Sequence, residues 1–443
     1  MKYSYAQLST YRDRVADLLL GQDPQLQFLD LDERANSITL GYSGNLESVV
    51  ARVRRDLALT EQSGDWVRAE RVAPARPDTK SYAATSASML TASSLTGQAD
   101  TIVAGLVIHR ALASGYKGCT LGFTAKRNNV IGFVTNSHCT EDMYGTGGTY
   151  NSFGQTFTRT IGTESVDPSG YTCGALPPTE CRGADAAFIQ SNGAVPYRIG
   201  FIAKPSSRNT GNLTVSLSDP YIRIASTGTA VAGMTVEKIG AVTGWTSGAV
   251  THTCVTAMIQ EDSWFKRVAC ADKALYAAEN GDSGSPVFLW LPYNPSEGGV
   301  QAGLLGIHSS GEIEGNSKYF SRIDRIESDL GGSWEYLGPV PPSPLQAHIW
   351  GWTDVLASGS CQLIYSAHAT GGAGGYSFSS MTTDGVIVST GSNSITVAFP
   401  SAGSHWVSVT VTDAASTVST ATFTVQADGT NFECYGAPPG NPF

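Results

Sequence analysis

The stretch GDSGSP, residues 281–286, places one serine between two glycines and directly after an aspartate, two thirds of the way along a chain of 443 residues. Gly, Asp, Ser and Pro are also the usual turn-forming residues, so the stretch alone fits an ordinary polar turn. Ser283 becomes a nucleophile only if other parts of the chain supply a base, an acid that orients the base, and backbone N–H groups that bind an anion. The rest of the sequence decides between these interpretations.

A candidate base follows a strand-like run in GFVTNSHCTED, residues 132–142. Phe133 and Val134 predict a strand that delivers His138 at its end, and an imidazole titrates near neutral pH, as a general base should. Cys119 precedes a neighbouring predicted strand, so a Cys119–Cys139 bridge would pin the histidine loop. Six other histidines compete with His138, and none has a comparable strand–His–Cys context: His109, His252, His308, His348, His368 and His405.

A candidate orienting acid lies between the histidine and the serine, in RGADAAFIQ, residues 182–190. Asp185 follows small residues and precedes an apolar strand, which suits a carboxylate buried beside an imidazole, although a strand-capping aspartate would look the same. Asp142 and Asp167 are rivals, but each lies in a polar stretch that no strand follows. The order along the chain is therefore His138, Asp185, Ser283, a set that can activate a hydroxyl group.

Composition narrows the class of protein. The chain is 41% hydrophobic and 15% charged, with a net charge of −10, which indicates a β-rich globular protein and argues against nucleic acid as a partner. No apolar run approaches the roughly 18–20 residues of a membrane span. No metal-binding C-x-x-C pattern occurs, and we expect no cofactor, no metal and a monomeric chain.

Eight cysteines, an even number, predict four disulfides and an oxidising, extracellular compartment, with reduced structural cysteines as the alternative. The start of the chain has no apolar signal core. We therefore expect either that an export signal has been removed or that the compartment is a reducing one. The cysteines expected to pair are Cys119, Cys139, Cys173, Cys181, Cys254, Cys270, Cys361 and Cys434.

The chain divides by pattern into five parts. Two helical periods and three short strand-like runs predict a small α/β unit over 1–78, and a Ser-, Thr- and Ala-rich stretch predicts a flexible linker over 79–99. Residues 100–336 alternate short β-branched runs with Gly-rich turns, which is typical of antiparallel barrels or sandwiches. A stiff Pro-rich linker over 337–346 precedes a predicted β-sandwich over 347–443. There, Cys361 and Cys434 would tie the two ends together or lie buried between the sheets.

TNSHC, ADAAF and GDSGSP, in this order, resemble the chymotrypsin-like serine peptidases. GCTLGF before the histidine and VEKIGAVTGWTSGAV at 236–250 are most similar to the bacterial secreted branch, the streptogrisin and α-lytic type. The resemblance covers roughly residues 100–330 and implies two six-stranded antiparallel barrels with the active site between them. The expected fold class is therefore mainly β, a double antiparallel β-barrel preceded by a small α/β unit and followed by a β-sandwich.

Carried over residue by residue, the resemblance makes His138 the base, Asp185 the orienting acid and Ser283 the nucleophile. The backbone N–H groups of Gly281 and Ser283 would form the oxyanion hole, and Gly281 leaves room for the approaching oxygen. Asp282 would be a buried acid that holds the loop. It needs a cationic partner, and Lys238 lies where that branch has a basic residue, usually Arg.

The resemblance also implies where the substrate side chain is read. The residues expected around it are Ala277, Ala278, Glu279, Asn280, His308, Ser309, Ser310 and Gly311, of which the last three would pair with the substrate backbone as an added strand. A trypsin-like pocket carries Asp where this chain has Ala277, which argues against Lys or Arg preference. Glutamyl-specific members place a histidine at the position of His308, although they tend to carry Ser or Thr where this chain has Ala278. Preference for Glu and preference for large apolar residues remain rivals.

The parts on either side of residues 100–336 also have a predicted role. The N-terminal unit lies where such peptidases carry a pro-region, which predicts a zymogen cut within the linker at 80–98, with a permanently attached accessory domain as the alternative. The C-terminal part resembles PKD-like or other immunoglobulin-like modules, with Tyr376 and Trp406 as candidate surface aromatics for a polymer or cell-surface ligand. The sequence thus predicts a secreted serine endopeptidase with a polypeptide substrate. The competing class is a non-catalytic binding or adhesion protein with the same fold.

Overall fold

The structure is a computed structural model of the 443-residue chain. The residues that it describes are 3–20, 22–57, 66–78, 80–82, 94–97, 99–112, 115–140, 152–156, 159–172, 179–261, 264–294, 299–312, 317–339, 345–353, 361–370, 372, 375–391, 393–399, 401, 403–427 and 434–435. The chain forms two compact units, one of residues 1–293 and 300–339, the other of residues 294–299 and 340–443.

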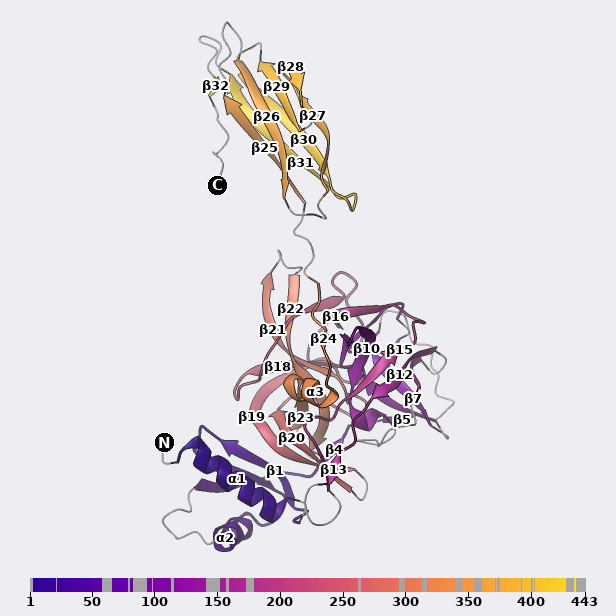
Figure 1. The fold of residues 1–443 in the computed structure, drawn as a ribbon, viewed down its shortest axis with the longest axis vertical. Coiled ribbons are helices and arrows are strands. Elements are labelled where there is room, and N and C mark those ends of the chain that lie inside the picture. Colours follow the sequence, from indigo (N-terminus) through magenta and orange to yellow (C-terminus); the bar gives the residue numbers. More distant parts are fainter. Residues whose placement is uncertain are drawn as a thin grey trace. The chain divides into compact units, whose positions relative to one another are not determined.

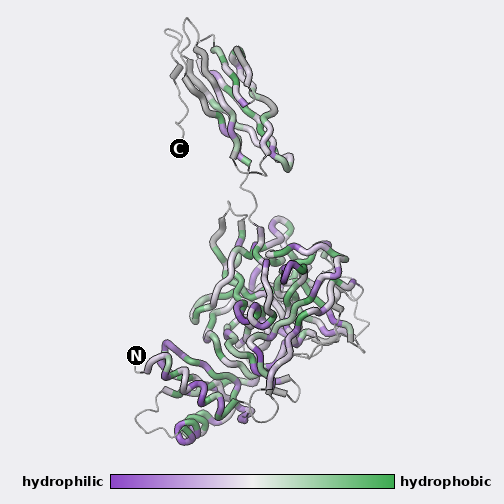
Figure 2. Tube along the Cα trace, viewed as in Figure 1, coloured by the Kyte–Doolittle hydropathy of each residue, from purple (hydrophilic) through white to green (hydrophobic). Residues whose placement is uncertain are grey.

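The N-terminal part of the first unit has two helices and three strands, as the sequence predicted (Figure 1). They are α1 (Tyr5–Leu19), β1 (Leu26–Asp32), β2 (Ser37–Tyr42), α2 (Leu46–Asp56) and β3 (Val67–Arg71). A capping box between Ser4 and Gln7 starts α1, and its buried residues recur at helical spacing, so green and purple alternate along it in Figure 2. Trp66, fully buried before β3, stacks on Tyr11 of α1 and closes this small core.

One sheet of the first unit runs through both the N-terminal part and the middle part of the chain. Its main path is β13 (Tyr171–Thr172), β14 (Thr179–Arg182), β20 (Trp264–Ala274), β23 (Lys318–Arg322), β22 (Gly299–Glu312), β21 (Pro286–Asn294), β18 (Thr235–Gly240), β19 (Gly244–Glu261), β1, β2 and β3. Four further strands pair with it: β4 (Ala75–Pro77), β6 (Ile102–Ala104), β16 (Tyr197–Ala203) and β17 (Tyr221–Thr227).

A second sheet of nine strands makes the other half of the middle part. Its order is β24 (Trp334–Glu335), β9 (Phe123–Arg127), β10 (Val130–Thr135), β15 (Ala187–Ser191), β12 (Arg159–Val166), β11 (Ser152–Thr156), β7 (Val107–Leu112), β8 (Gly115–Thr120) and β5 (Lys80–Tyr82). Apolar side chains from both sheets, among them Phe133, Phe188, Ile239 and Ile307, share one buried core with helix α3 (Ile323–Leu330). The expected fold class, mainly β with a double antiparallel β-barrel in the middle, is confirmed.

The N-terminal part docks on the long hairpin of β19 and β20. Strand β1 pairs with β19, with Phe28 opposite Ala257. The Phe28 ring is fully buried in a cluster that also holds Val255 and Tyr319 of the middle part. Gly41 makes room for this ring, because a Cβ atom there would lie 2.2 Å from it. The N-terminal part is thus joined to the middle part by a shared sheet and a shared core.

Two pieces of the predicted linker over 79–99 lie on the middle part. Lys80–Tyr82 form strand β5, which pairs with β8. Leu95 is fully buried in the main core, and its N–H donates to the carbonyl oxygen of Leu213 at 2.9 Å. A flexible linker is therefore not what the chain forms at these two places, because backbone pairing and an apolar anchor hold them. Residues 83–93 of the predicted linker lie outside the described residues.

The second unit consists of two sheets of four strands each. They are β25 (Gln346–Thr353), β26 (Cys361–Thr370), β29 (Ser394–Phe399) and β28 (Val386–Thr390) in one sheet, and β27 (Ser377–Thr383), β30 (Gly403–Thr412), β31 (Val418–Ala427) and β32 (Cys434–Tyr435) in the other. Alternate residues of the strands fill its core, for example Val407, Val409 and Val411. The predicted sandwich is therefore present. Tyr376 and Trp406 are both exposed.

Candidate active site

Ser283 lies in the tight turn that leads into β21. The glycines on either side of it have positive φ values, 108° at Gly281 and 90° at Gly284, which side chains with a Cβ atom rarely adopt. Gly284 is also enclosed, since a Cβ atom there would lie 2.1 Å from the carbonyl oxygen of Thr120. The Thr120 N–H in turn donates to the carbonyl oxygen of Ser283 at 2.7 Å. The glycines of the quoted stretch thus let the turn press against the second sheet.

His138 lies in a single 3-10 turn, Ser137–Cys139, directly after β10. A disulfide between Cys139 and Cys119 ties this turn to β8, as the sequence predicted. The His138 Nε2 atom lies 2.8 Å from the Ser283 Oγ atom, and its Nδ1 atom lies 2.6 Å from the Asp185 Oδ2 atom. The structure therefore brings together the three candidate residues in the geometry of a nucleophile, a base and an orienting acid.

The acid is held from several sides. Asp185 Oδ1 accepts from the His138 backbone N–H at 3.1 Å, so both carboxylate oxygens bind the same residue. The Asp185 N–H donates to the Ser321 Oγ atom at 3.0 Å, and the Asn136 side chain donates to the Asp185 carbonyl oxygen at 2.8 Å. The side chains of His138, Asp185 and Ser283 are all completely buried. This array fixes the imidazole ring with Nε2 toward the serine.

The rival Asp167 has a different place. Its carboxylate pairs with Arg182 at 2.6 Å and accepts hydrogen bonds from the hydroxyl groups of Ser137 and Thr140. It therefore supports the turn around His138 without a hydrogen bond to the imidazole ring. Asp142, the other rival, lies outside the described residues.

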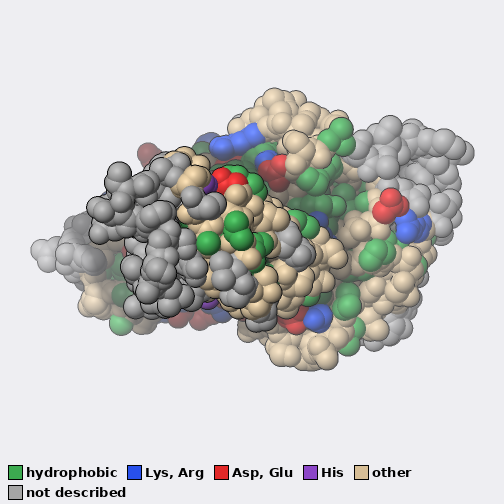
Figure 3. Space-filling model, turned by 90° about the horizontal axis from the view of Figure 1, so that it is seen from above, with side chains coloured by type: hydrophobic (Ala, Val, Ile, Leu, Met, Phe, Trp, Pro, Cys, Tyr) green, Lys and Arg blue, Asp and Glu red, His purple; other side chains and the backbone are tan. Residues whose placement is uncertain are grey.

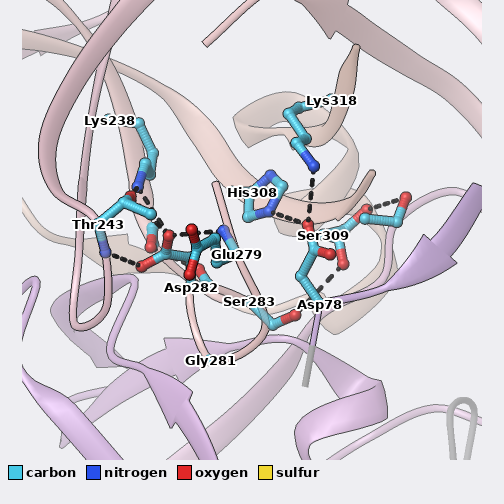
Figure 4. A network of polar contacts seen from close by, with 12 residues as sticks. Asp78, Lys238, Thr243, Glu279, Gly281, Asp282, Ser283, His308, Ser309 and Lys318 are labelled. Atoms are coloured by element: carbon cyan, nitrogen blue, oxygen red, sulfur yellow. Dashed lines mark hydrogen bonds and ion pairs between the residues drawn. The ribbon is translucent and has the colours of Figure 1, made fainter. Parts of the chain in front are cut away.

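Asp282 makes a buried ion pair with Lys238 at 3.1 Å, and both side chains are completely inaccessible to solvent. The carboxylate also accepts from the Thr243 hydroxyl at 2.6 Å and from the N–H groups of Val242 and Glu279 at 2.9 and 3.0 Å. Burial alone would raise the pKa of Asp282, but these partners, Lys238 first, hold that pKa below its ordinary value. An ionised Asp282 thus fixes the turn that carries Ser283 (Figure 4).

The chain's own Asp78 occupies the centre of the site, which sequence reasoning missed. Its carbonyl oxygen accepts from the backbone N–H of Gly281 at 2.5 Å and lies 3.5 Å from the N of Ser283. These are the two groups expected to bind an oxyanion. Asp78 directly follows β4, whose Pro77 and Arg76 pair with Ser310 and Gly311 of β22. A strand of the chain itself thus pairs with two of the three residues that were expected to bind the substrate backbone, and their pairing with a substrate stays a prediction.

The side chain of Asp78 points away from Ser283 toward two basic residues (Figure 4). Its Oδ2 atom lies 3.0 Å from the His308 Nε2 atom and 3.8 Å from the Lys318 Nζ atom. The opposite side of the His308 ring meets the Tyr276 hydroxyl, 3.1 Å from Nδ1. Gly311 lines the same space, and a Cβ atom there would lie 2.3 Å from Lys318 Nζ and 3.0 Å from Asp78 Oδ2. Lys318 and Tyr276 were not expected from the sequence.

The protonation states of this pocket follow from burial. Burial lowers the pKa of His308, although the neighbouring Asp78 acts in the opposite direction. Burial raises the pKa of Tyr276 well above its ordinary value, so the phenol keeps its proton. The Tyr276 hydroxyl can then donate to Nδ1 of a neutral His308, whose Nε2–H donates to the carboxylate. In this arrangement Lys318 supplies the positive charge and His308 the directed hydrogen bond.

Four of the residues expected around the substrate, Ala278, Glu279, Asn280 and Gly311, line a cavity at the same place. A cavity of about 600 Å³ is lined by Arg76, Pro77, Asp78, Ala278, Glu279, Asn280, Gly311, Glu312 and Lys318. Ser309 contributes its carbonyl oxygen, 3.4 Å from Ser283 Oγ. Ala277 is exposed, and its carbonyl oxygen accepts from the Thr246 hydroxyl at 2.9 Å, so it does not line the cavity.

Among the described residues, one group has the spacing of a metal site: Cys119, His138 and Cys139, whose ligand atoms lie within 4.8 Å of one another. The two cysteines form a disulfide, and the His138 ring nitrogens face Asp185 and Ser283. The sulfur atoms of Cys119 and Cys139 are therefore not thiolates, which is the form of cysteine that binds metals. This arrangement does not fit a metal ion.

The cysteines form disulfides as far as the structure describes them. Besides Cys119–Cys139, a second bridge joins Cys254 and Cys270 across the β19–β20 hairpin. Cys181 is also disulfide-bonded. Cys173 and the side chains of Cys361 and Cys434 lie outside the described residues, so the predicted bridge in the sandwich stays a prediction.

Two further features concern possible partners: the distribution of charged side chains on the surface, and the length and apolar character of the helices. On the face that Figure 3 shows, the described Lys and Arg side chains form small separate patches beside acidic ones. Within the described ranges, no helix combines the length and the apolar character needed to cross a membrane.

No protein-family model and no curated protein matches the chain. Among solved structures, Thermobifida fusca protease A is 20% identical over 54% of this chain and 100% of its own, with a TM-score of 0.36. Cellulomonas bogoriensis chymotrypsin gives the same identity and coverage with a TM-score of 0.35. A glutamic acid-specific serine protease described as using a histidine triad in substrate binding is also 20% identical, over 51% of this chain and 96% of its own, with a TM-score of 0.35.

Proposed function

We propose that this protein is a serine endopeptidase that cleaves peptide bonds on the carboxyl side of acidic residues. One observation carries the proposal. The carbonyl oxygen of Asp78 lies at the N–H groups of Gly281 and Ser283, while the Ser283 hydroxyl is hydrogen-bonded to His138. A backbone carbonyl therefore occupies the place where a substrate carbonyl would be attacked.

The geometry supports acyl-enzyme chemistry. Ser283 Oγ attacks the substrate carbonyl carbon as His138 Nε2 takes the hydroxyl proton, and Asp185 stabilises the imidazolium that forms. The Gly281 and Ser283 N–H groups stabilise the developing oxyanion, and loss of one such donor typically costs about 3 kcal/mol of transition-state stabilisation. His138 then protonates the leaving amine. Water hydrolyses the ester with His138 as the base, which restores the Ser283 hydroxyl.

The pocket favours an acidic side chain over a large apolar one, the two rivals that the sequence left open. The Lys318 ammonium group and the His308 Nε2–H group face the side chain next to the scissile bond. An apolar side chain would bury these groups without partners, which costs about 1–3 kcal/mol per unsatisfied polar group and more for a charge. A carboxylate satisfies both of them. A large apolar side chain is therefore the poorer substrate.

Aspartate fits this pocket better than glutamate, the acidic residue considered from the sequence. With the carbonyl of Asp78 at the oxyanion donors, its carboxylate already reaches His308 Nε2 at 3.0 Å. His308 cannot retreat, because Tyr276 lies behind its ring and its backbone N–H and C=O bind Ser285 and Gly284 at 2.8 Å each. A side chain longer by one methylene group would have to fold to fit.

The proposal also covers the compartment, the precursor state and the ligand of the sandwich. The disulfides and the globular sandwich suit a secreted, monomeric protein, and the occupied site suits synthesis as a zymogen. A polymer or cell-surface ligand of the sandwich would use the exposed Tyr376 and Trp406. The competing class is a non-catalytic binding protein. Binding alone does not require a serine hydroxyl that is hydrogen-bonded to an oriented imidazole. An active-site reagent separates the two classes.

The test combines labelling with a substrate panel. The protein is treated with a fluorophosphonate before and after limited proteolysis, which removes Asp78 from the site, and the intact mass is recorded. We expect one adduct after proteolysis and none in Ser283→Ala. Peptide amides with Asp, Glu, Phe, Leu or Lys before the scissile bond should then be cleaved in the order Asp, Glu, Phe, with little turnover of Lys. The absence of any adduct would favour the non-catalytic class, and Phe above Asp would overturn the acidic specificity.

A further inference from the structure

The sheet alone does not fix His138 against Asp185. Strands β10 and β15 pair in antiparallel fashion, and their last pair joins Thr135 to Ala187. Both the base and the acid lie beyond this pair, His138 in its 3-10 turn and Asp185 just before β15 begins. Buried backbone groups beyond the end of a ladder need partners of another kind. The Asn136 side chain supplies one such link, to the Asp185 carbonyl oxygen.

Arg182 holds the segment that carries the acid. Its Nη2 atom donates to the carbonyl oxygen of Ala186 at 2.7 Å. Its Nε atom lies 3.3 Å from the Oδ2 atom of Asp329 in α3, and the same oxygen accepts from the Ala184 N–H at 2.8 Å. One guanidinium group and its partner carboxylate thus bind the residues on both sides of Asp185.

The same guanidinium group holds the segment that carries the base. Its Nη1 atom donates to the Asp167 Oδ1 atom at 2.6 Å and to the Pro168 carbonyl oxygen at 2.9 Å. The second oxygen of Asp167, Oδ2, accepts from the Ser137 hydroxyl at 2.9 Å and lies 3.2 Å from the Thr140 Oγ1 atom. Ser137 directly precedes His138, and Thr140 closes the turn. The guanidinium group therefore links both ends of the base's turn to both neighbours of the acid.

The chemistry of this network favours positioning over stability. The side chains of Arg182 and Asp167 are 3% and 4% exposed, and a buried ion pair contributes little net stability because both charges lose their water. A guanidinium group carries its donors in a rigid plane, so each partner fixes the direction available to the others. A lysine at this place would keep the charge but not this set of directions.

We propose that Arg182 is a positioning residue that sets the place of His138 relative to Asp185. Through the base it also determines how directly the imidazole faces the Ser283 hydroxyl. The effect on catalysis rests on the proposed function, and the inference adds a residue that acts through the backbone around the base and the acid. A displacement of about 1 Å near a reacting group can cost about 100-fold in rate, so the loss of this positioning should appear in kcat.

The test replaces Arg182 by lysine. After limited proteolysis, the active sites are titrated with a fluorophosphonate, and kcat per titrated site is measured with an Asp peptide. We expect Arg182→Lys to lower kcat about 10- to 100-fold and to change KM by less than about 2-fold. The matched control is Arg127→Lys, because Arg127 donates to the carbonyl oxygens of Leu330 and Gly331 at the end of the same helix. The control should keep its kcat per titrated site.

Asp329→Ala tests the same network from its outer end and serves if Arg182→Lys does not fold. The Asp329 side chain is 19% exposed, so its removal disturbs the core less. The Ala184 N–H then loses its acceptor, and we expect kcat to fall about 3- to 10-fold, as for one ordinary hydrogen bond. Because the two residues act together, the double variant should lose little more than Arg182→Lys alone. Losses that multiply would overturn the shared role.

A second measurement does not depend on catalysis. In the Ser283→Ala chain with nitrogen-15 in its histidines, NMR follows the proton between His138 Nδ1 and Asp185, and its exchange with water is measured. We expect exchange about tenfold faster in Arg182→Lys, because exchange follows local opening of the pair, and no change in Arg127→Lys.

The outcomes separate this inference from the function on which its catalytic effect rests. If Arg182→Lys only lowers the fraction of sites that can be titrated, while kcat per site stays the same, Arg182 merely supports the fold and the inference is overturned. An equal loss of kcat in Arg127→Lys overturns it as well. If the unaltered chain forms no adduct and cleaves no peptide after limited proteolysis, the proposed function fails. Proton exchange then decides the inference: equal rates in Arg182→Lys and Arg127→Lys overturn it.

Discussion

Two buried aspartates lie on opposite sides of Ser283, and each faces a lysine. Asp282 is sealed from solvent, 3.1 Å from Lys238, with additional hydrogen bonds from a hydroxyl group and from backbone N–H groups. Asp78 has one hydrogen bond from His308 and lies 3.8 Å from Lys318. The first carboxylate is surrounded on all sides, as a permanent part of the fold must be. The second is held by a few donors that another carboxylate could use equally well.

The largest effect should come from breaking the Asp282 pair. Asp282→Asn leaves the Lys238 ammonium group buried without a counter-charge, and such a loss typically costs about 3–5 kcal/mol. We expect that decrease in the free energy of unfolding, measured by urea denaturation in the Ser283→Ala background to prevent self-cleavage. Asp324→Asn, at an exposed pair with Arg322, is the control and should change stability by less than about 1 kcal/mol. Similar values for both variants would contradict the structural role of Asp282.

A third buried aspartate sharpens the comparison because its nearest charged neighbours are acidic. Burial first, and then Asp32 and Glu70, raise the pKa of Asp30 in β1 to about 7. The folded chain thus keeps a proton on Asp30 that the unfolded chain releases above about pH 4. The stability that this proton maintains is therefore fully present below about pH 4, and it is lost as the pH rises to 7. We expect the free energy of unfolding of the Ser283→Ala chain to fall by on the order of 2 kcal/mol between pH 5 and 7.5. Asp30→Asn should flatten that slope, and an unchanged slope would refute the assignment.

The role proposed for the Asp78 site is tested through its lysine. Lys318→Met keeps most of the side-chain volume but removes the charge that faces the Asp78 carboxylate. We expect kcat/KM for an Asp substrate to fall about 10- to 100-fold, with little change for a Phe substrate, since loss of a hydrogen bond or pair to a charged group is worth about 1.5–3 kcal/mol. Lys126→Met, at an exposed pair with Glu335, is the matched control. An equal loss for both substrates would indicate a structural role for Lys318.

Removal of the Tyr276 hydroxyl, which lies behind the His308 ring, should lower kcat/KM by a smaller factor. Tyr276→Phe removes the donor to Nδ1, so the ring no longer prefers the tautomer that donates from Nε2 to the substrate. We expect a roughly 3- to 10-fold loss of kcat/KM for Asp substrates, equivalent to about one ordinary hydrogen bond. Tyr319→Phe provides a control, because the Tyr319 hydroxyl is buried without a hydrogen-bond partner among the described residues. If both variants lose the same activity, the hydroxyl of Tyr276 does not orient the ring.

The parts of the site found from the sequence are those with a local signature. His138 follows a strand and precedes a cysteine, Asp185 precedes an apolar strand, and Ser283 lies in a glycine-rich turn. Each of these contexts is a few residues long, and so is the one that suggested Lys238 as the partner of Asp282. The small α/β unit and the C-terminal sandwich were predicted on the same basis, from helix and strand periods, whereas the double barrel was what the resemblance implied.

The parts that were missed depend on pairing between distant segments. Asp78 is only the last residue of the predicted α/β unit, and Lys318 belongs to no motif that the sequence analysis used. Only the register of β4 on β22, and of β22 on β23, brings them within reach of each other. Composition does not encode register, which is decided by the whole sheet. The sequence therefore left the choice between acidic and apolar substrates open, and the proposal of acidic substrates draws on the contacts that this register creates.

The shared sheet has a consequence for the proposed processing of the chain. If the N-terminal part is removed, the stretch of β19 around Thr256, Ala257 and Ile259 loses the strands that pair with it on one side. A freshly uncovered strand edge is a template for unwanted association with other chains. The Cys254–Cys270 bridge lies at this stretch and keeps the hairpin closed without its former neighbour. If the proposed precursor loses its N-terminal part, the active site is unblocked but this strand edge is exposed, and the solubility of the remaining chain would then depend on how well the β19–β20 hairpin resists pairing with other chains.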